Sequence, residues 1–263
     1  MAQNDGWGRA EPLEDATATS LIASSQGLPG SGKSHFWATA PDPIAWFLFD
    51  PGGLKGFKAN RVFRGKDIRV FDYCGEINVG KLPPEERVQR SIEALDKFKE
   101  EWDLAVKKAR TLVIDKESML WEVMRYAFDE VRSPDPKSFH ELNLMYRGWV
   151  QDAENNGINF GMIRDMHDTW GKVGVSKSSG NVQMGFTGKF IPDGQKYVPG
   201  LVQINLEHRW DDEDREFKVK ILEKCRLGNA VDLIGTESGG LDFLGLVTML
   251  YPEMDPEEWG IEL

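Results

Sequence analysis

The segment from Gly27 to Ser34 reads GLPGSGKS, a glycine-rich run that ends in lysine and serine. Glycines let successive backbone N–H groups turn toward one centre, where they hold phosphate oxygens. The lysine of such a loop reaches the β- and γ-phosphates of ATP, and the next hydroxyl ligates Mg²⁺. An ordinary glycine turn is the competing interpretation, but an apolar run precedes the segment and a helical pattern follows it. The predicted ATP-binding residues are Gly27, Gly30, Ser31, Gly32, Lys33, Ser34 and His35.

A carboxylate follows a later buried run. Thr111 to Asp115 reads TLVID, and an aspartate at the tip of a buried strand can hold Mg²⁺ together with the loop hydroxyl. Any strand can end in aspartate, so it is the loop earlier in the chain that makes Asp115 the predicted metal partner of Ser34. Glu117 has two open interpretations. It either activates the attacking water or is a first-turn glutamate that favours the helix dipole.

Apolar runs alternate with helical patterns through the first two thirds of the chain, which predicts a parallel sheet covered by helices on both faces. We therefore expect an α/β fold with three α/β/α layers. The expected strands are 44–49, 68–73, 111–115 and 158–166, and the expected helices are 33–39, one opening at 83–84, 119–131 and 139–155.

The last third changes character. Residues 171–196 are rich in Gly, Ser and Lys and are predicted to form a long loop, which in a compact domain is usually either functional or disordered. Residues 201–209 and 216–223 alternate polar and apolar side chains, which predicts a C-terminal β-hairpin. The predicted organisation is a flexible tail over 1–16, one ATP-binding domain over 17–235, and an acidic segment over 236–263 that packs on or trails the core.

Composition limits the classes of partner. The formal net charge is −11, whereas proteins that wrap duplex DNA are usually basic overall. Nucleic-acid contact must therefore be local. No apolar run is long enough to span a membrane, and the first residues lack the pattern of a signal peptide. Cys74 and Cys225 have no metal-binding spacing, so we expect a reducing, cytoplasmic setting.

Two predicted strands lie between the glycine-rich loop and TLVID, which resembles the RecA-like ATPase core more than the AAA+ core. In that comparison 50–54 (DPGGL) falls where RecA-like proteins end their second strand, and 163–167 (IRDMH) falls at their polar γ-phosphate sensor, which implies such a role for Asp165 and His167. RecA-like ATPases often carry a catalytic glutamate after the second strand, whereas this chain has Gly52 and Gly53. Rapid hydrolysis is then in doubt, or its base is Glu117.

The resemblance extends to residues that act between subunits and on DNA. Lys224-Cys225-Arg226 resembles the Lys-x-Arg pair that reaches a neighbouring subunit's ATP site. The segment 171–196 occupies the place of a loop that touches single-stranded DNA, which implies DNA contacts for its lysines, with loop solubility as the plainer interpretation. The lysines are Lys172, Lys177, Lys189 and Lys196. Trp170 is a candidate for base stacking, although a core role is the commoner one for tryptophan.

Over about residues 17–230 the chain resembles phage-encoded proteins that consist of a RecA-like core alone, some of which are single-strand annealing recombinases. The resemblance implies an ATPase that oligomerises on single-stranded DNA in the host cytoplasm and makes a single-strand-binding protein a candidate partner. The alternative is a nucleotide-dependent switch or assembly protein that binds protein partners and never DNA. A small-molecule kinase ranks last, because 171–196 contains no arginine to form a lid.

Overall fold

The computed structural model describes residues 20–50, 55, 63–74, 82–128, 134–175, 182–223 and 226–259. Its centre is a nine-stranded sheet with the order β3-β2-β4-β5-β1-β7-β8-β9, in which β6 pairs with β5 outside this path. The strands are β1 Ile22–Gly27, β2 Ile44–Leu48, β3 Ile68–Asp72, β4 Thr111–Asp115, β5 Asn159–Val175, β6 Val182–Pro192, β7 Ile204–Asp211, β8 Glu216–Ile221 and β9 Glu237–Gly239.

The sheet is largely parallel. Each neighbouring pair from β3 to β7 along the order runs parallel, whereas β8 and β9 add antiparallel strands at one edge. This confirms the predicted α/β class with a mainly parallel sheet. β2 and β4 are buried along their whole length, as continuous apolar runs require in a sheet that is covered on both faces.

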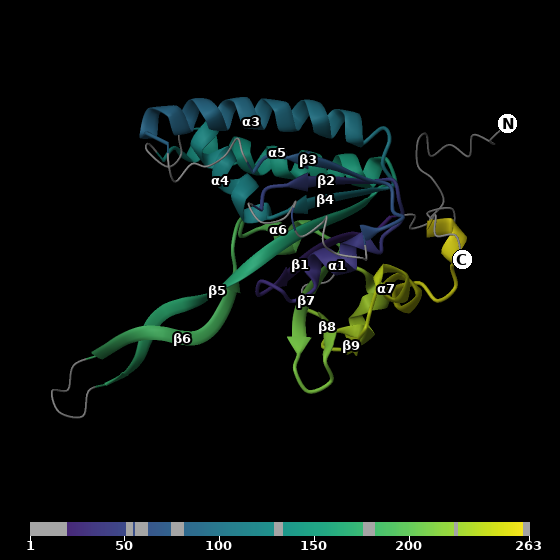
Figure 1. Ribbon diagram of the computed structural model, residues 1–263. Helices are drawn as coiled ribbons and strands as arrows, with labels where there is room; N and C mark the ends of the chain where they lie inside the picture. Colours follow the sequence, from purple (N-terminus) through teal and green to yellow (C-terminus); the bar gives the residue numbers. More distant parts are fainter. Residues whose placement is uncertain are drawn as a thin grey trace, which may run out of the picture.

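Helices cover both faces of the sheet (Figure 1). One face carries α3 Pro84–Ala105, α4 Glu117–Ala127, α5 Pro136–Asn155 and the short α6 Val198–Leu201. The opposite face carries α1 Lys33–Ala38, α7 Phe243–Leu250 and the 3₁₀ segments η3 Gly228–Leu233 and η4 Pro256–Trp259. None of the helices in these described residues is long and apolar enough to cross a membrane.

Two apolar cores hold these layers together. Phe98 and Trp102 of α3 meet Phe47 of β2, and Trp102 also lies edge-on to Phe160 of β5. On the other face, Trp37 of α1 packs directly against the backbone of Gly161, where an added Cβ would lie 2.4 Å from the indole. Gly161 therefore lets α1 sit close against β5, which fixes the start of the helix relative to the sheet.

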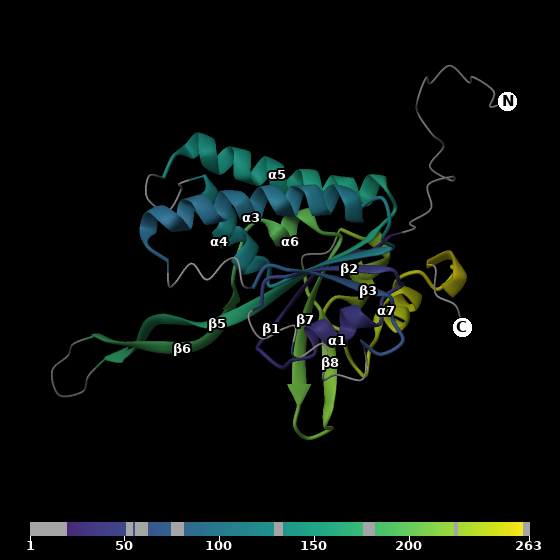
Figure 2. The same ribbon diagram turned by 45° about the horizontal axis from the view of Figure 1, so that its top comes forward.

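The segment predicted as a long loop is instead a two-stranded arm. β5 leaves the parallel sheet after Asp165 and pairs antiparallel with β6 from Met166–Pro192 to Val175–Val182. Ten residues of extended chain project roughly 30 Å, and Figures 1 and 2 show the arm reaching away from the body of the molecule. The loop prediction is therefore wrong for 171–175 and 182–192, because glycines that usually indicate loops here lie within a strand pair. Residues 176–181 lie outside the described residues.

Candidate phosphate site

The glycine-rich loop joins β1 to α1 at the carboxyl end of the sheet. Gly30 and Gly32 have φ angles of 80° and 94°, the left-handed region that glycine adopts without strain. Gly32 has a second reason to be glycine, since an added Cβ would lie 2.6 Å from the Phe217 ring. His35, in the first turn of α1, contacts the same ring at 5.5 Å between centroids. The β7–β8 strands thus support the loop from one side.

Lys33 lies under this loop. Its ammonium donates to the carbonyl oxygens of Gly27 at 2.8 Å and Leu28 at 3.0 Å, and it pairs with Asp165 Oδ1 at 3.1 Å. Within the described residues, the Ser31 hydroxyl is buried without a hydrogen-bond partner. A buried hydroxyl of this kind is satisfied when a phosphate oxygen enters the loop. The loop therefore presents an ammonium and a free donor at the place where the sequence predicts phosphates.

Ser34 and Asp115, the predicted metal ligands, lie together. The Ser34 hydroxyl donates to Asp115 Oδ2 at 3.1 Å, and the Trp46 indole donates to the same oxygen at 3.2 Å. Burial raises the pKa of Asp115 to about 6, although these two hydrogen bonds oppose the shift. The two ligands come from different elements, α1 and β4, and the parallel register of the sheet brings them to one point.

The residues fit a nucleotide-bound Mg²⁺ better than an independent metal centre. In the part of the chain that the structure describes, no three His, Cys, Asp or Glu side chains gather to hold a metal ion. Mg²⁺ usually keeps several waters and is bound through one or two protein oxygens together with phosphate oxygens. Ser34 and Asp115 supply that number, and the remaining ligands would come from the nucleotide and water.

Asp165 sits beside the loop because β5 lies next to β1, with Gly27 and Asp165 in register. Its second oxygen pairs with Lys116 Nζ at 3.0 Å, so one carboxylate holds two lysines. Burial opposes ionisation of Asp165, but the hydrogen bond from Lys116 and the charge of Lys33 outweigh it and lower its pKa. Sequence reasoning missed Lys116, whose only signal is its place directly after Asp115.

Glu117 does not lie at this site as a free base. Its carboxylate is completely buried, pairs with Arg164 Nε at 3.3 Å and accepts hydrogen bonds from the Tyr146 hydroxyl at 2.5 Å and the Gln195 backbone at 3.1 Å. A carboxylate with these three partners and no exposed surface leaves no position for an attacking water. The interpretation of Glu117 as the activating base is therefore not supported, and its place in the first turn of α4 remains.

The predicted intersubunit residue lies at the other end of the sheet. The Arg226 backbone donates to Gln203, whose own N–H donates to Ile22 at the start of β1, five residues before Gly27. The exposed guanidinium faces the Leu201 carbonyl at 3.4 Å. Arg226 is thus not part of its own phosphate site. Lys224 lies outside the described residues, as do Gly52, Gly53 and Lys177.

The other predicted residues lie along the arm or at its base. The His167 side chain is half exposed and its Nδ1 contacts Asp193 Oδ1 at the base of the arm. Lys172 and Lys189 are exposed on β5 and β6 respectively, and Lys196 is exposed just after β6. Trp170 is 63% exposed, so the core interpretation of this side chain is wrong. It lies edge-on to Phe186, which is 67% exposed, with 5.1 Å between the ring centroids.

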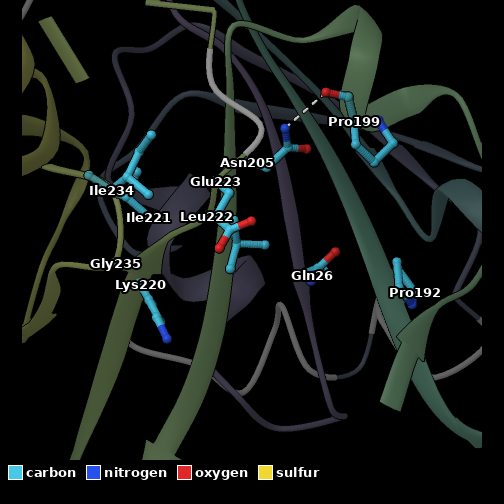
Figure 3. Close-up of a pocket in the computed structure, with 10 residues that line it drawn as sticks. All are labelled: Gln26, Pro192, Pro199, Asn205, Lys220, Ile221, Leu222, Glu223, Ile234 and Gly235. Carbon is cyan, nitrogen blue, oxygen red and sulfur yellow. Dashed lines mark hydrogen bonds between the residues drawn. The ribbon is translucent and has the colours of Figure 1, made fainter. Parts of the chain in front are cut away.

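Two cavities flank the loop region. One of about 330 Å³ borders the loop backbone from Gly27 to Ser31 and extends to Met166, Phe190 and the end of β7. A second, of about 550 Å³, lies along β7 and β8 and is lined by Gln26, Asn205, Lys220 and Glu223 among others (Figure 3). None of the predicted site residues lines the second cavity. We therefore place the candidate site at the loop.

The chain matches no protein-family model and no curated protein.

Proposed function

We propose that this protein binds ATP–Mg²⁺ at the loop between β1 and α1. The observation that carries the proposal is the 3.1 Å contact between Ser34 and Asp115, with Lys33 directly beneath the loop. Residues 81 positions apart in the chain supply a hydroxyl and a carboxylate at one point. Beside them is an ammonium whose partners, among the described residues, are two backbone carbonyls and one aspartate. A bound Mg²⁺ would neutralise charge on the β- and γ-phosphates.

Each residue has a defined part in binding. Lys33 exchanges its carbonyl partners for phosphate oxygens, and Ser34 and Asp115 turn their oxygens toward the metal instead of toward each other. The buried Ser31 hydroxyl donates to phosphate. Asp115 must be ionised to ligate the metal, and the cation itself favours that ionised form despite the burial that raises the carboxyl pKa.

Nucleotide titration tests this proposal. We expect wild type to bind a fluorescent ATP analogue with Mg²⁺ and to bind it only weakly without the metal. Lys33→Ala should abolish binding. Lys108→Ala, which removes an exposed lysine near the end of α3, is the matched control and should bind like wild type. Asp115→Asn should raise the Mg²⁺ concentration needed for half-saturation. Binding by Lys33→Ala at wild-type affinity would overturn the proposal.

We further propose that the arm of β5 and β6 contacts single-stranded DNA. Trp170 and Phe186 are direct cross-strand partners, and Lys172 lies two residues along β5 opposite Met184, so these side chains share one face of the arm. Exposed aromatic rings stack on bases and nearby lysines neutralise phosphates, which together bind single strands without reading sequence. The contact is local, as the net charge of −11 requires.

Charge-matched lysine variants test the proposed contact with single-stranded DNA. Lys172→Ala with Lys189→Ala should weaken single-strand binding and reduce the slope of log K against log salt by about 1.4, since each contact contributes about 0.7. Lys107→Ala with Lys108→Ala removes the same charge from the turn after α3 and should leave the slope unchanged. Trp170→Ala should weaken binding at every salt concentration. If wild type with ATP–Mg²⁺ binds no single-stranded DNA, this proposal fails while nucleotide binding stands.

A RecA-like oligomer acting in phage recombination, annealing or replication remains our preferred setting for both activities. It is supported by the two strands, β2 and β3, that separate the loop from β4. The alternative, a nucleotide-dependent assembly protein, is favoured by one observation: Val182, Met184 and Phe186 expose an apolar surface that a protein partner would bury. Capture of a protein partner that depends on ATP, with hydrolysis indifferent to DNA, would select this alternative.

A further inference from the structure

Lys116 occupies an unusual backbone position directly after the predicted metal ligand Asp115. Its φ angle is 75° and its ψ angle 85°, in the left-handed region that non-glycine residues rarely adopt. β4 ends at Asp115 and α4 begins at Glu117, so Lys116 is the single residue that joins them. This conformation directs its side chain toward Asp165, across the carboxyl end of the neighbouring strand β5.

Lys116 and Lys33 share one carboxylate. Asp165 Oδ1 pairs with Lys33 and Oδ2 pairs with Lys116, which places both ammonium groups beside the glycine-rich loop. Burial lowers the pKa of Lys116, but the hydrogen bond and charge of Asp165 outweigh it and raise the pKa overall. The carboxylates of Asp50, Asp115 and Asp193 also act on these lysines, so the site carries no excess of positive charge. What a phosphate would find beside the loop is a pair of ammonium donors.

The position of Lys116 determines which phosphate of a bound nucleotide its ammonium would reach. The backbone N–H groups of a glycine-rich loop would enclose the inner phosphates and leave the terminal phosphate to other groups. Ser34 and Asp115 are the predicted metal ligands, and Lys116 directly follows Asp115, so its ammonium lies on the side of the loop where a terminal phosphate would be. The Lys116 side chain is 30% exposed, so it is accessible to a ligand.

We propose that Lys116 is a second phosphate-binding lysine that contacts the terminal phosphate of the nucleotide, and that Asp165 holds both lysines beside the loop until nucleotide binds. This inference rests on the proposed nucleotide function. A triphosphate competes with Asp165 for the two ammonium groups. Asp165 is then a positioning residue rather than a direct contact of the γ-phosphate, and Lys116 distinguishes a triphosphate from a diphosphate.

The test compares affinities for a non-hydrolysable ATP analogue and for ADP, each with Mg²⁺, by calorimetry. Lys116→Gln keeps the length of the side chain and removes its charge. We expect it to weaken binding of the analogue by roughly tenfold or more, the effect of losing a charge-assisted hydrogen bond, and to change ADP affinity little. Lys116→Arg should restore most of the preference for the triphosphate, and exposed Lys108→Gln should leave both affinities unchanged.

Asp165→Asn gives the opposite result. Removing the competing carboxylate charge should tighten the binding of both nucleotides, with a larger effect on the analogue. Melting temperatures of all variants show that each is folded. Equal weakening of both nucleotides by Lys116→Gln, or no weakening, overturns the inference while the proposed function stands. If wild type binds neither nucleotide, the proposed function and this inference fail together.

Discussion

Several ionisable side chains near the glycine-rich loop are buried, and a different interaction or protonation state offsets the cost of desolvating each one. Asp115 has hydrogen bonds from Ser34 and Trp46, and Glu117 has an arginine partner. His208 is 2% exposed, contacts the Ser25 hydroxyl at 3.0 Å and lies edge-on to Phe36. Burial and, secondarily, the charge of Lys33 lower the pKa of His208 to about 3. This histidine is therefore neutral in the folded protein at neutral pH.

His208 should make stability depend on pH. Between about pH 6.5 and 3 the unfolded chain binds a proton at this residue that the folded chain does not, so acid favours unfolding. We expect about 2 kcal/mol of stability to be lost at His208 between pH 7 and 5. His208→Gln removes this loss, which urea unfolding at several pH values would measure as a shallower dependence than wild type.

The effect of His208 must be measured as the difference in stability between wild type and His208→Gln at each pH, because protonation of Asp115 changes stability in the opposite direction. Its raised pKa means that the folded chain takes up the proton first, so acid favours the folded state at Asp115. That contribution is common to wild type and variant and cancels. His140→Gln, at an exposed position on α5, should follow the wild-type curve. Parallel curves for wild type and His208→Gln would contradict the prediction.

The sequence predicts part of this site for a definite reason. The loop residues proposed to bind phosphate lie within eight consecutive positions, and Asp115 ends an apolar run, so both have local signals. The ion pairs of Asp165 do not. They depend on β5 lying between β1 and β4, with Gly27 opposite Asp165 and Asp115 opposite Ile163. Lys116 reaches Asp165 only through a backbone conformation that its residue type disfavours.

One buried network of hydrogen bonds and an ion pair holds the base of the arm against the neighbouring helices. Arg164 precedes Asp165 on β5 and its side chain donates to Glu117, to the Asp193 carbonyl at 3.0 Å and to the Gln195 carbonyl at 3.1 Å. Glu117 in turn accepts hydrogen bonds from Tyr146 of α5 and from the Gln195 backbone. The network joins α4 and α5 to the two chain segments at the base of the arm, one entering β5 and one leaving β6. It lies immediately beside Lys116.

Removing one partner of this network should cost more than a surface change. Glu117→Ala leaves Arg164 buried without its counter-charge, for which we expect a loss of about 3–5 kcal/mol in the free energy of unfolding. Hydrogen exchange should rise at the backbone amide of Gln195. Exposed Glu141→Ala on α5 is the control. A Glu117→Ala protein of wild-type stability that has lost only ATP hydrolysis would instead favour the catalytic-base interpretation.

The arm also shows why the sequence predicted a loop over 171–196. Val182, Met184, Phe186 and Phe190 are exposed β-formers, and Gly185 and Gly188 lie among them. Alternation identifies a strand when one face is buried, but neither face of this arm packs on the core. The glycines then favour a loop. The buried strands β2 and β4 were predicted to within a residue or two, because their burial makes them continuously apolar.

In the whole molecule the glycine-rich loop and Arg226 lie at opposite ends of the sheet. Ile22, near Arg226, lies five positions before Gly27 along β1, which corresponds to about 17 Å of extended chain. Arg226 therefore cannot serve the phosphates of its own chain. Any role for it in hydrolysis requires a second copy, arranged head to tail so that one subunit's loop meets the next subunit's arginine.

Mixing two inactive variants tests this arrangement. Arg226→Ala should bind ATP but not hydrolyse it, and Lys33→Ala should not bind it, so neither is active alone. In a head-to-tail assembly of equal parts, about a quarter of the interfaces join an intact loop to an intact arginine, and hydrolysis should recover to about that fraction of wild type. Diluting the mixture should reduce the recovered rate per chain.

The control for mixing is the double variant of Lys33→Ala and Arg226→Ala, which should restore no activity to either single variant. Recovery that depends on concentration would place Arg226 at a neighbour's phosphates and would establish the oligomer at the same time. Full activity of Arg226→Ala alone would remove Arg226 from the mechanism. An inactive Arg226→Ala that mixing cannot rescue would mean that the arginine acts within its own chain, against the separation that β1 imposes.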